Sequence, residues 1–293
     1  MARAGTRAQR VAERRQQILD AARGIAEADG WTAVTSRRLA DAIGYTQPVL
    51  YGHFPGGMTE IMRTVALAGF AELTAATQAA MGGKTGPRAV TAVADAYLRF
   101  AAAHPSLYEA MFQLPIDARF AQDDAEAELR SGFNALAAAL GDDGDGTATE
   151  LLWSALHGMS LLERAGRMRE EHRPNRIAEL AAATQAAMGG KTGPQAVAAV
   201  ADVYLDFAAA HPSLYEAMFQ LPIDARFAQD DAETELRSGF NALGAALGND
   251  GDGTATELLW SALHGMSQLE RAGRMRPEHR PNRIAELAAR FAN

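Results

Sequence analysis

The 293-residue sequence contains no cysteine. Disulfide bonds and thiolate metal sites are therefore excluded within it, because both need a cysteine sulfur. Long apolar runs are also missing, since charged residues or glycines interrupt every Ala/Leu-rich stretch before it reaches the roughly 20 residues that a membrane-spanning helix needs. The first ten residues, MARAGTRAQR, lack the apolar core of a secretion signal. These absences predict a cytoplasmic protein that has no membrane partner.

The chain is acidic as a whole, but its first 56 residues carry a net positive charge. The formal net charge is −8, from 28 basic and 36 acidic residues. Residues 1–56 hold eight arginines and five acidic residues, a net charge of +3, whereas residues 57–293 hold 20 basic and 31 acidic residues, a net charge of −11. Nucleic-acid binding depends on local patches of charge rather than on the net charge. The first 56 residues are therefore the candidate nucleic-acid-binding part, although a solvated helix start would explain the arginines equally well.

A domain-length repeat occupies most of the remaining sequence. Residues 72–178 align without gaps to residues 179–285 at an offset of 107, and we count ten differences between them. The repeating unit is longer than the roughly 20–50 residues of solenoid repeats and is long enough to form a small domain. We therefore expect three parts, named here the head (residues 1–56), the first body (residues 57–178) and the second body (residues 179–293).

The head is expected to contain three helices. The segment AERRQQILDAARGIAEADGW places apolar residues on one helical stripe and ends at Gly30. Thr35 or Ser36 can cap a second helix, RRLADAI, and Gly44 can take the left-handed conformation of the turn that follows it. Thr46 can cap a third helix, QPVLYGHF. The order of a long helix followed by two short ones joined by a tight turn predicts a helix-turn-helix.

The third helix has the residue types that reach into a DNA major groove. Leu50 and Phe54 can hold it against the rest of the head, which leaves Gln47, Pro48 and Tyr51 able to face outward. A glutamine can bond an adenine edge through both of its polar atoms, and Pro48 with its neighbour Val49 can touch thymine methyl groups. Tyr51 and His53 can donate hydrogen bonds to phosphates. A tight helical hairpin with core aromatic residues is the structural alternative.

The string TSRRLADAIGYTQPVLYGHF, preceded by one long helix, resembles the DNA-binding head of the tetracycline-repressor (TetR) family of bacterial transcription regulators over about residues 10–70. The resemblance implies that Ser36, Tyr51 and His53 hold phosphates and that Arg37 and Gln47 read base edges. The full set of expected DNA-binding residues is Ser36, Arg37, Thr46, Gln47, Pro48, Val49, Tyr51 and His53. The family usually has a lysine after the HF turn, where this chain has PGGMTE. Gly57 cannot make that phosphate contact, so we expect a lower affinity or a shallower salt dependence.

Two further strings resemble one C-terminal ligand-binding class of the same family. LLWSALHGM at residues 151–159 is similar to its W-H-G signature, HPSLYEAMF at residues 104–112 fits the same class, and both strings recur in the second body. The resemblance implies an all-α fold with two tandem helical bundles, in which a ligand lodges among the helices and the last two helices form a dimer seam. We expect Thr147 and Glu150 to form a capping box at the start of one helix.

The aromatic and histidine residues of the two bodies are the candidate ligand contacts. An aromatic stripe at helical spacing is also typical of an ordinary core, and this alternative stays open. The candidates are Tyr97, Phe100, His104, Tyr108, Phe112, Trp153 and His157 in the first body, and Tyr204, Phe207, His211, Tyr215, Phe219, Trp260 and His264 in the second.

Other motifs do not predict chemistry. GGKTG resembles part of a phosphate-binding loop, but Gln78 stands where the first glycine of that motif is required. GDDGDGTATE has the composition of a calcium loop, yet its register places Gly141 at the first ligand position and Leu152 at the last. No paired histidines indicate a metal site and no nucleophile stands beside a base, so we expect no metal, no cofactor and no catalytic residue.

These observations predict a transcription regulator, not an enzyme. We expect a repressor that a small molecule releases from its operator DNA. A ligand-sequestering or protein-interaction module with a vestigial head is the alternative. We expect a homodimer, because such regulators read two half-sites with two heads; the alternative is an intramolecular pseudo-dimer of the two bodies. The junction at residues 173–190 presents a conflict, because one helix would have to end the first body and begin the second.

Overall fold

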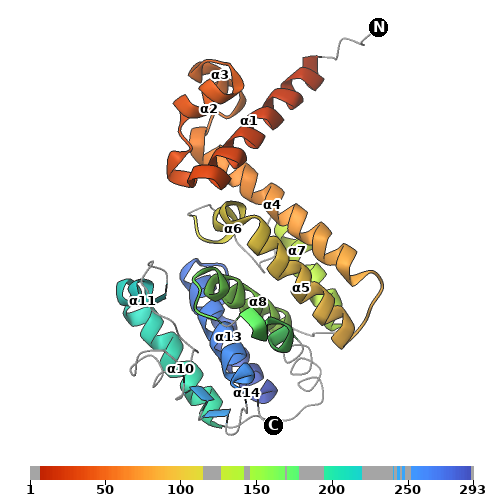
Figure 1. Cartoon of the computed structure of the whole chain (residues 1–293), viewed down its shortest axis with the longest axis vertical. Helices are drawn as coiled ribbons and strands as arrows, with labels where there is room; N and C mark the ends of the chain where they lie inside the picture. Colours follow the sequence, from red (N-terminus) through yellow and green to blue (C-terminus); the bar gives the residue numbers. More distant parts are fainter. Residues whose placement is uncertain are drawn as a thin grey trace. The chain divides into compact units, whose positions relative to one another are not determined.

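The structure is a computed structural model, and it describes residues 7–114, 127–141, 146–168, 170–177, 195–219, 240, 243–244, 246–247 and 252–291. The regular elements in these ranges are all helices, which confirms the predicted all-α class (Figure 1). None of the helices in the described ranges is long and apolar enough to cross a bilayer. The conflict expected at residues 173–190 falls largely on residues 178–194, which lie outside the described ranges.

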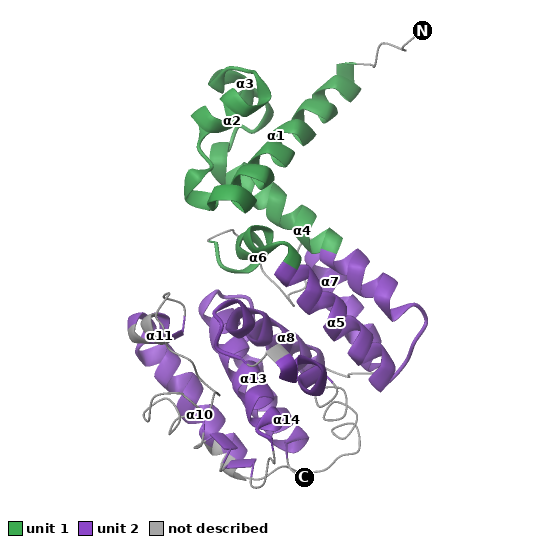
Figure 2. Ribbon diagram, viewed as in Figure 1, with its two compact units in different colours: residues 1–72, 103–118 green, residues 73–102, 119–293 purple. Residues whose placement is uncertain are grey.

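The chain divides into two compact units, which are coloured separately in Figure 2. Unit 1 contains residues 1–72 and 103–118, and unit 2 contains residues 73–102 and 119–293. Residues 103–114, which belong to the first body by sequence repeat, therefore fold together with the head. The boundaries drawn from the repeat remain a prediction about domains, and each compact unit is described below by itself.

The head begins unit 1 with the three predicted helices, α1 (Arg7–Asp29), α2 (Ser36–Ile43) and α3 (Gln47–His53), and a 3-10 turn at Trp31–Ala33. Thr35 is the cap of α2, since its hydroxyl accepts the backbone N–H of Arg38 at 3.2 Å. Gly44 ends α2 in the left-handed conformation with φ of 70°, as the sequence predicts for a tight turn.

Unit 1 also contains the start of α4 (Gly57–Met81) and all of α6 (Pro105–Phe112). These two helices pack closely at Gly69, where an added Cβ would lie 2.7 Å from the sulfur of Met111 and 2.9 Å from Leu107. Phe70 and Phe112 meet edge to face, with ring centroids 5.2 Å apart. A glycine and two aromatic rings therefore fix α6 against the first part of α4.

In the part of the chain that the structure describes, unit 2 holds seven further α-helices from both bodies. They are α5 (Pro87–Ala103), α7 (Ala127–Leu140), α8 (Thr147–Arg164), α10 (Gln195–Ala210), α11 (Pro212–Phe219), α13 (Thr254–Arg271) and α14 (Arg280–Arg290), with 3-10 turns at Glu170–His172 and Pro277–His279. Helices α8 and α13 are the same segment of the repeat, and they pack against each other (Figure 1).

The predicted capping box at the start of α8 is wrong. Gly146, with φ of 82°, is the N-cap and makes no side-chain cap, and Thr147 is already the first helical residue. Glu150 is fully buried and pairs with Arg283 and Arg276 instead. A buried carboxylate needs a cation beside it. The Glu150 side chain is therefore positioned by its ion pairs with the two arginines and not by a capping hydrogen bond to the backbone of the first turn.

Candidate nucleic-acid interface and ligand site

The predicted recognition helix α3 has one buried side and one exposed side. Leu50 and Phe54 are buried, with 2% and 0% of their surface exposed. Gln47 and Pro48 are exposed, and Tyr51 keeps 49% of its surface accessible. This is the division predicted for a helix that lies on the head and presents its other face to a partner.

The other expected DNA contacts lie on α3 and on the adjacent start of α2. Arg37 is exposed and Ser36 is half-buried in the first turn of α2. Thr46 occupies the N-cap position of α3 but its side chain makes no capping hydrogen bond, contrary to the capping role expected for it. Val49 and His53 are half-buried on α3. The motif thus places seven of the eight expected residues on two helices that contact each other, and the eighth, Thr46, at the N-cap of α3.

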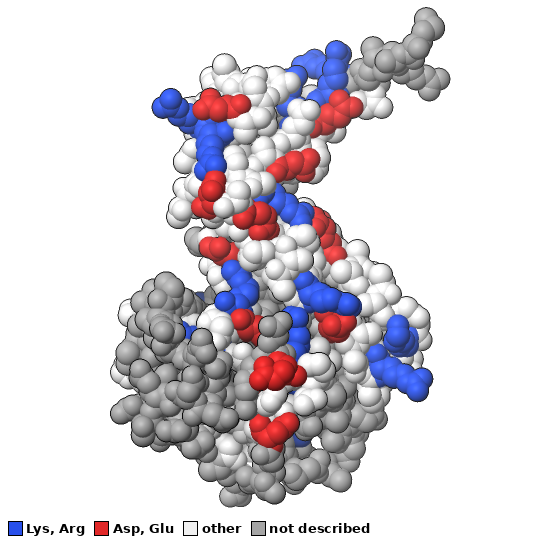
Figure 3. Space-filling model, viewed as in Figure 1, with Lys and Arg blue, Asp and Glu red and all other residues white. Residues whose placement is uncertain are grey.

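Two arginines of α1, which sequence reasoning did not assign a role, fix the ends of this motif. The guanidinium of Arg15 lies 4.0 Å from the ring centre of Phe54 and donates to the backbone carbonyl of His53. Arg14 lies 4.7 Å from the ring centre of Tyr45. Figure 3 shows basic side chains near the start of α1. Burial, followed by the positive charges of Arg14 and Arg15, lowers the pKa of His53, so this imidazole is neutral at neutral pH and offers one N–H.

The turn after α3 explains why this chain has glycine where the family usually has lysine. Gly57 has φ of +63°, a conformation that side chains rarely adopt. A Cβ there would lie 3.3 Å from the ring of Tyr51. The neighbouring N–H of Gly56 donates to the Glu60 carboxylate at 2.8 Å. A side chain at position 57 would therefore be strained and would crowd the tyrosine expected to hold a phosphate.

A contact between α1 and α6 joins the head to a segment of the first body within unit 1. The carboxylate of Glu27 accepts the backbone N–H groups of Ser106 and Leu107, each at 3.0 Å. The hydroxyl of Ser106 donates to the carbonyl of Ala26 at 2.8 Å, and the indole of Trp31 donates to the carbonyl of Ser106 at 2.6 Å. Glu27 thus satisfies the orphan donors at the start of α6, where the helix dipole also favours an anion. We call this set the α1–α6 contact.

His104, one of the expected ligand residues, lies beside the α1–α6 contact. Its Nδ1 is 3.3 Å from Nη2 of Arg23, and Arg23 also pairs with Glu72 at 2.6 Å. The sequence signal that could have indicated this contact is the position of His104 directly before the Pro-Ser start of a helix, which is a position for end contacts rather than for a core.

In the second body, five of the expected ligand residues form one cluster, in which Tyr204 is half-buried and the other four are buried. The hydroxyls of Tyr204 and Tyr215 are 2.8 Å apart, and the Tyr215 hydroxyl is 2.5 Å from Nδ1 of His264. The ring of Phe219 lies beside those of Trp260 and His264, at centroid distances of 6.0 and 5.3 Å. Helices α10, α11 and α13 therefore bring polar groups together inside an aromatic wall, which is the composition typical of a small-molecule site.

The environment of this cluster holds its groups neutral. Burial is the main cause that lowers the pKa of His264 to about 3, and the charges of Arg167 and Arg271 lower it further. Burial also raises the pKa of the Tyr215 hydroxyl. A neutral imidazole and two phenols can exchange hydrogen bonds with an uncharged polar group of a ligand.

Two other second-body candidates lie beside each other, and two residues that were not among the candidates contact the cluster. Phe207 and His211 lie beside each other with ring centroids 5.0 Å apart, and His211 is exposed rather than part of the cluster. Ser267, which donates to the Tyr215 hydroxyl at 2.9 Å, was missed. Arg271, whose guanidinium lies 6.0 Å from the Tyr215 ring centre, was also missed. Both follow His264 at helical spacings of three and seven residues, and that spacing was an available signal.

The first-body counterparts divide between the two units. Tyr108 and Phe112 are buried in unit 1 with ring centroids 4.6 Å apart. The counterparts in unit 2 are also buried; they are Tyr97, Phe100, Trp153 and His157. Burial first, and then the neighbouring His264, Arg274 and Arg164, holds the pKa of His157 well below its usual range. His157 and His264 are thus electrostatic neighbours from different bodies.

The capped α2, the glycine turn and the exposed face of α3 define a helix-turn-helix protein of the DNA-binding class. Residues 18–65 match the tetR family of bacterial regulatory proteins, and residues 90–185 and 197–292 each match the tetracyclin repressor-like C-terminal domain. An uncharacterized HTH-type transcriptional regulator of Mycobacterium tuberculosis is 30% identical over 161 residues, which cover 53% of this chain and 72% of that protein. The chain belongs to the TetR family of transcriptional regulators, which are DNA-binding proteins and not enzymes, and it carries the C-terminal domain twice.

Proposed function

We propose that this TetR-family regulator is a repressor whose head holds operator DNA until a small molecule binds in a body. The α1–α6 contact is the observation that supports this proposal. Helix α6 belongs to the first body by sequence and carries the ligand candidates Tyr108 and Phe112. Its first turn is hydrogen-bonded to α1, the helix on which the recognition motif rests. A ligand that displaces α6 would therefore change the position of α1.

On the DNA side, we propose that exposed Gln47 and Arg37 read base edges and that Ser36, Tyr51 and His53 hold phosphates. Bidentate contacts of glutamine with adenine and of arginine with guanine supply sequence discrimination. Phosphate contacts set the register of the protein and make binding depend on salt. The exposure of Tyr51 and the rigid support from Leu50 and Phe54 agree with these roles.

On the ligand side, we propose that a small, mainly apolar molecule with an uncharged polar group binds among the aromatic residues of each body. In the second body its polar group would replace one hydrogen bond of the Tyr204, Tyr215 and His264 chain. Trp153 and His157 of unit 2 recur as Trp260 and His264, so each chain would offer up to two sites. Calorimetry with a compound found by thermal-shift screening should then count up to two molecules per chain.

A gel shift on a duplex taken from the DNA upstream of the protein's own gene tests the proposal. We expect specific binding that survives competition by random DNA, and release when a stabilising compound from a library of apolar and aromatic molecules is added. Binding that the random DNA removes completely would indicate a vestigial head. Specific binding that no stabilising compound weakens would contradict the repressor mechanism and leave the DNA-binding role intact.

A further inference from the structure

The two bodies of one chain meet at a backbone-to-backbone crossing of α8 and α13. A Cβ added at Gly158 would lie 1.7 Å from the carbonyl oxygen of Ser261, and one added at Gly265 would lie 1.8 Å from the carbonyl oxygen of Ser154. Position 158 corresponds to 265 in the repeat, and 154 corresponds to 261. Each body therefore presents the same glycine to the same serine carbonyl of the other, as in the two-fold interface of a homodimer.

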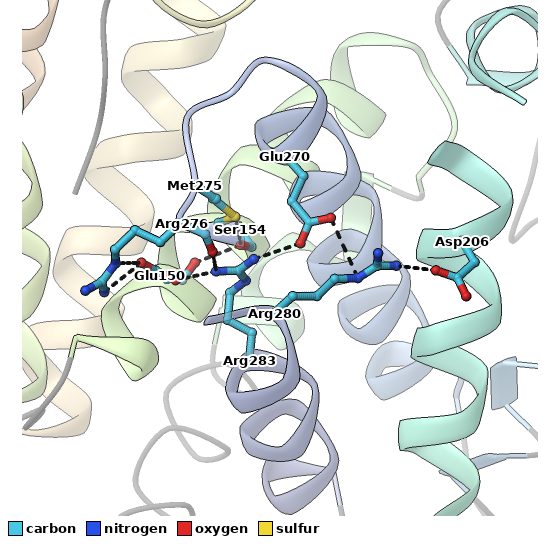
Figure 4. Close-up of polar contacts among 8 residues, drawn as sticks. All are labelled: Glu150, Ser154, Asp206, Glu270, Met275, Arg276, Arg280 and Arg283. Carbon is cyan, nitrogen blue, oxygen red and sulfur yellow. Dashed lines mark hydrogen bonds and ion pairs between the residues drawn. The ribbon is translucent and has the colours of Figure 1, made fainter. Parts of the chain in front are cut away.

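Buried side chains repeat this reciprocity. Arg283 of the second body pairs with Glu150 of the first at 2.6 Å, and Arg176 of the first pairs with Glu257 of the second at 2.5 Å. All four side chains are completely buried. Figure 4 shows Glu150 between Arg283 and Arg276. Every one of these pairs joins one body to the other, so both carboxylates of the repeat are neutralised within the chain.

Sulfur contacts follow the same rule. The hydroxyl of Ser154 lies 4.0 Å from the sulfur of Met275, and the hydroxyl of Ser261 lies 3.8 Å from the sulfur of Met168. Met168 and Met275 are equivalent positions of the repeat. The glycine contacts, the ion pairs and the methionine contacts are thus all related by one pseudo-two-fold axis. We call the surface that these residues form the internal seam.

From this we infer that the internal seam takes the place of a seam between two chains, so that one chain is a complete unit with a single DNA-reading head. The expected homodimer through like bodies would have to separate the internal seam and rebuild it with identical residues of a second chain. Pairing within one chain and pairing between two chains use the same contacts. They differ in the concentration at which the two bodies meet. Both bodies belong to one chain, and covalently linked partners meet at an effective concentration on the order of 1 mM. At micromolar chain concentration, internal pairing is therefore favoured about a thousandfold.

The consequence concerns the DNA that the protein reads. Helix-turn-helix dimers recognise two half-sites because their symmetry presents two heads one DNA turn apart. The 293 residues contain one match to the DNA-binding domain and two to the C-terminal domain. The self-paired chain therefore reads one asymmetric half-site. This inference goes beyond the proposed repressor function, and it rests on that proposal only in assuming that the head binds DNA sequence-specifically.

Light scattering on the full chain between 1 and 50 µM tests the self-paired state directly. We expect one species at the 31.2 kDa mass of a single chain. A stable species at twice that mass would overturn the inference. Because this measurement uses the unmodified protein and no DNA, it decides the inference even if the repressor proposal fails.

A double-mutant cycle identifies which carboxylate faces which arginine. In the self-paired chain, E150Q and R283Q remove two partners of one ion pair, so their effects on the unfolding equilibrium should be non-additive by about tenfold or more. E150Q with R176Q is the matched control and should show a smaller interaction. In a dimer of like bodies, Glu150 would face Arg176 of another chain, so the larger interaction in the control pair would overturn the inference. If these variants do not fold, the mass of the unmodified chain still decides.

Selection from a library of random 30-base-pair duplexes tests the half-site. A single motif without inverted symmetry supports the inference, and an inverted repeat protected by one complex overturns it. If no motif is enriched, the proposed DNA-binding function fails, and the mass and the mutant cycle still determine whether the chain is self-paired.

Discussion

Individual side chains of the head are either buried, where they place α3, or exposed, where we propose that they contact DNA. Leu50 and Phe54 are buried and place α3, whereas Gln47 and Arg37 are exposed and carry groups that can reach base edges. Because the two tasks fall on different residues, a change in an exposed side chain should alter DNA recognition without altering folding.

Replacing Gln47 or Arg37 by alanine should therefore cost about 1–3 kcal/mol of binding free energy at the preferred sequence and relax the preference at one base pair. Tyr51→Phe removes a donor to phosphate, so it should weaken binding to all sequences alike. Competition gel shifts with the selected and with random duplexes measure both effects. Unchanged competition for Q47A and R37A would show that these side chains do not read bases.

A buried imidazole makes the stability of the second body depend on pH. The folded pKa of His264 is about 3, and its unfolded value is about 6.5. Between these values the unfolded chain binds a proton that the folded chain does not, so this contribution to stability is complete above about pH 6.5 and is lost as the pH falls toward 3.

Acidification from pH 7 to pH 5 should thus lower the free energy of unfolding by about 2 kcal/mol through His264 alone. The variant H264Q cannot take up the proton and can still accept a hydrogen bond from Tyr215, so it should lose less stability over the same range. Urea unfolding at the two pH values, followed by circular dichroism, measures the difference. An equal loss in the variant would mean that other groups cause the acid sensitivity.

Identical helices of this protein have different surroundings. The nonapeptide HPSLYEAMF forms both α6 and α11. The first turn of α6 is hydrogen-bonded to α1 through Ser106, whereas its counterpart Ser213 at the start of α11 is exposed. The environment, not the local sequence, therefore decides whether this helix start carries a contact.

Ser106→Ala should destabilise the protein by about 1 kcal/mol, because it removes the hydrogen bond to the carbonyl of Ala26. Ser213→Ala changes the same residue of the same nonapeptide at an exposed position, where effects usually stay within about 0.5 kcal/mol. Thermal or urea unfolding of the two variants makes the comparison. Similar losses for both would contradict the role assigned to the α1–α6 contact.

The two bodies are held to each other by a surface that excludes side chains at its centre. Gly158 and Gly265 allow the backbones of α8 and α13 to touch, and the surrounding arginines and glutamates neutralise one another. Breaking one partner of a buried ion pair leaves an uncompensated charge. The arrangement therefore tolerates little change, in contrast to the exposed Asp206–Arg280 pair of the second body (Figure 4).

Gly158→Ala should cost more than about 3 kcal/mol, because its Cβ would lie inside the contact distance of a backbone oxygen. Gly24→Ala is the matched control. Gly24 lies inside α1 with no atom within 4 Å of an added Cβ, so the same substitution should stabilise the helix by about 0.5–1 kcal/mol. Chemical unfolding of both variants measures the opposite signs. A tolerated G158A would contradict the close crossing.

Much of the head and little of the seam could be predicted. The Thr35 cap, the Gly44 turn and the buried Leu50 follow from neighbours within a few residues in the sequence, because capping and helical periodicity are local effects. The partners of Glu150 could not be predicted, because Arg276 and Arg283 lie more than 100 residues away and a carboxylate near a helix start equally fits a capping box. For the same reason the contact between His104 and Arg23 could not be predicted. The ligand role expected for His104 stays a prediction.

The sequence alone determined that this chain is all-helical with a duplicated body, because helix periodicity, turn glycines and a repeat at a constant offset are visible without folding. The DNA-binding regulator was predicted from the resemblance of the head to the TetR family. Tertiary structure alone decided which body meets which. Identical seam residues permit pairing within a chain and between chains, so no property of single residues distinguishes the two. In the structure Gly158 lies against Ser261 and Gly265 lies against Ser154, so the first body meets the second body of the same chain. The physical reason for this pairing is the covalent link, because it holds the two bodies at a higher concentration than that of free chains.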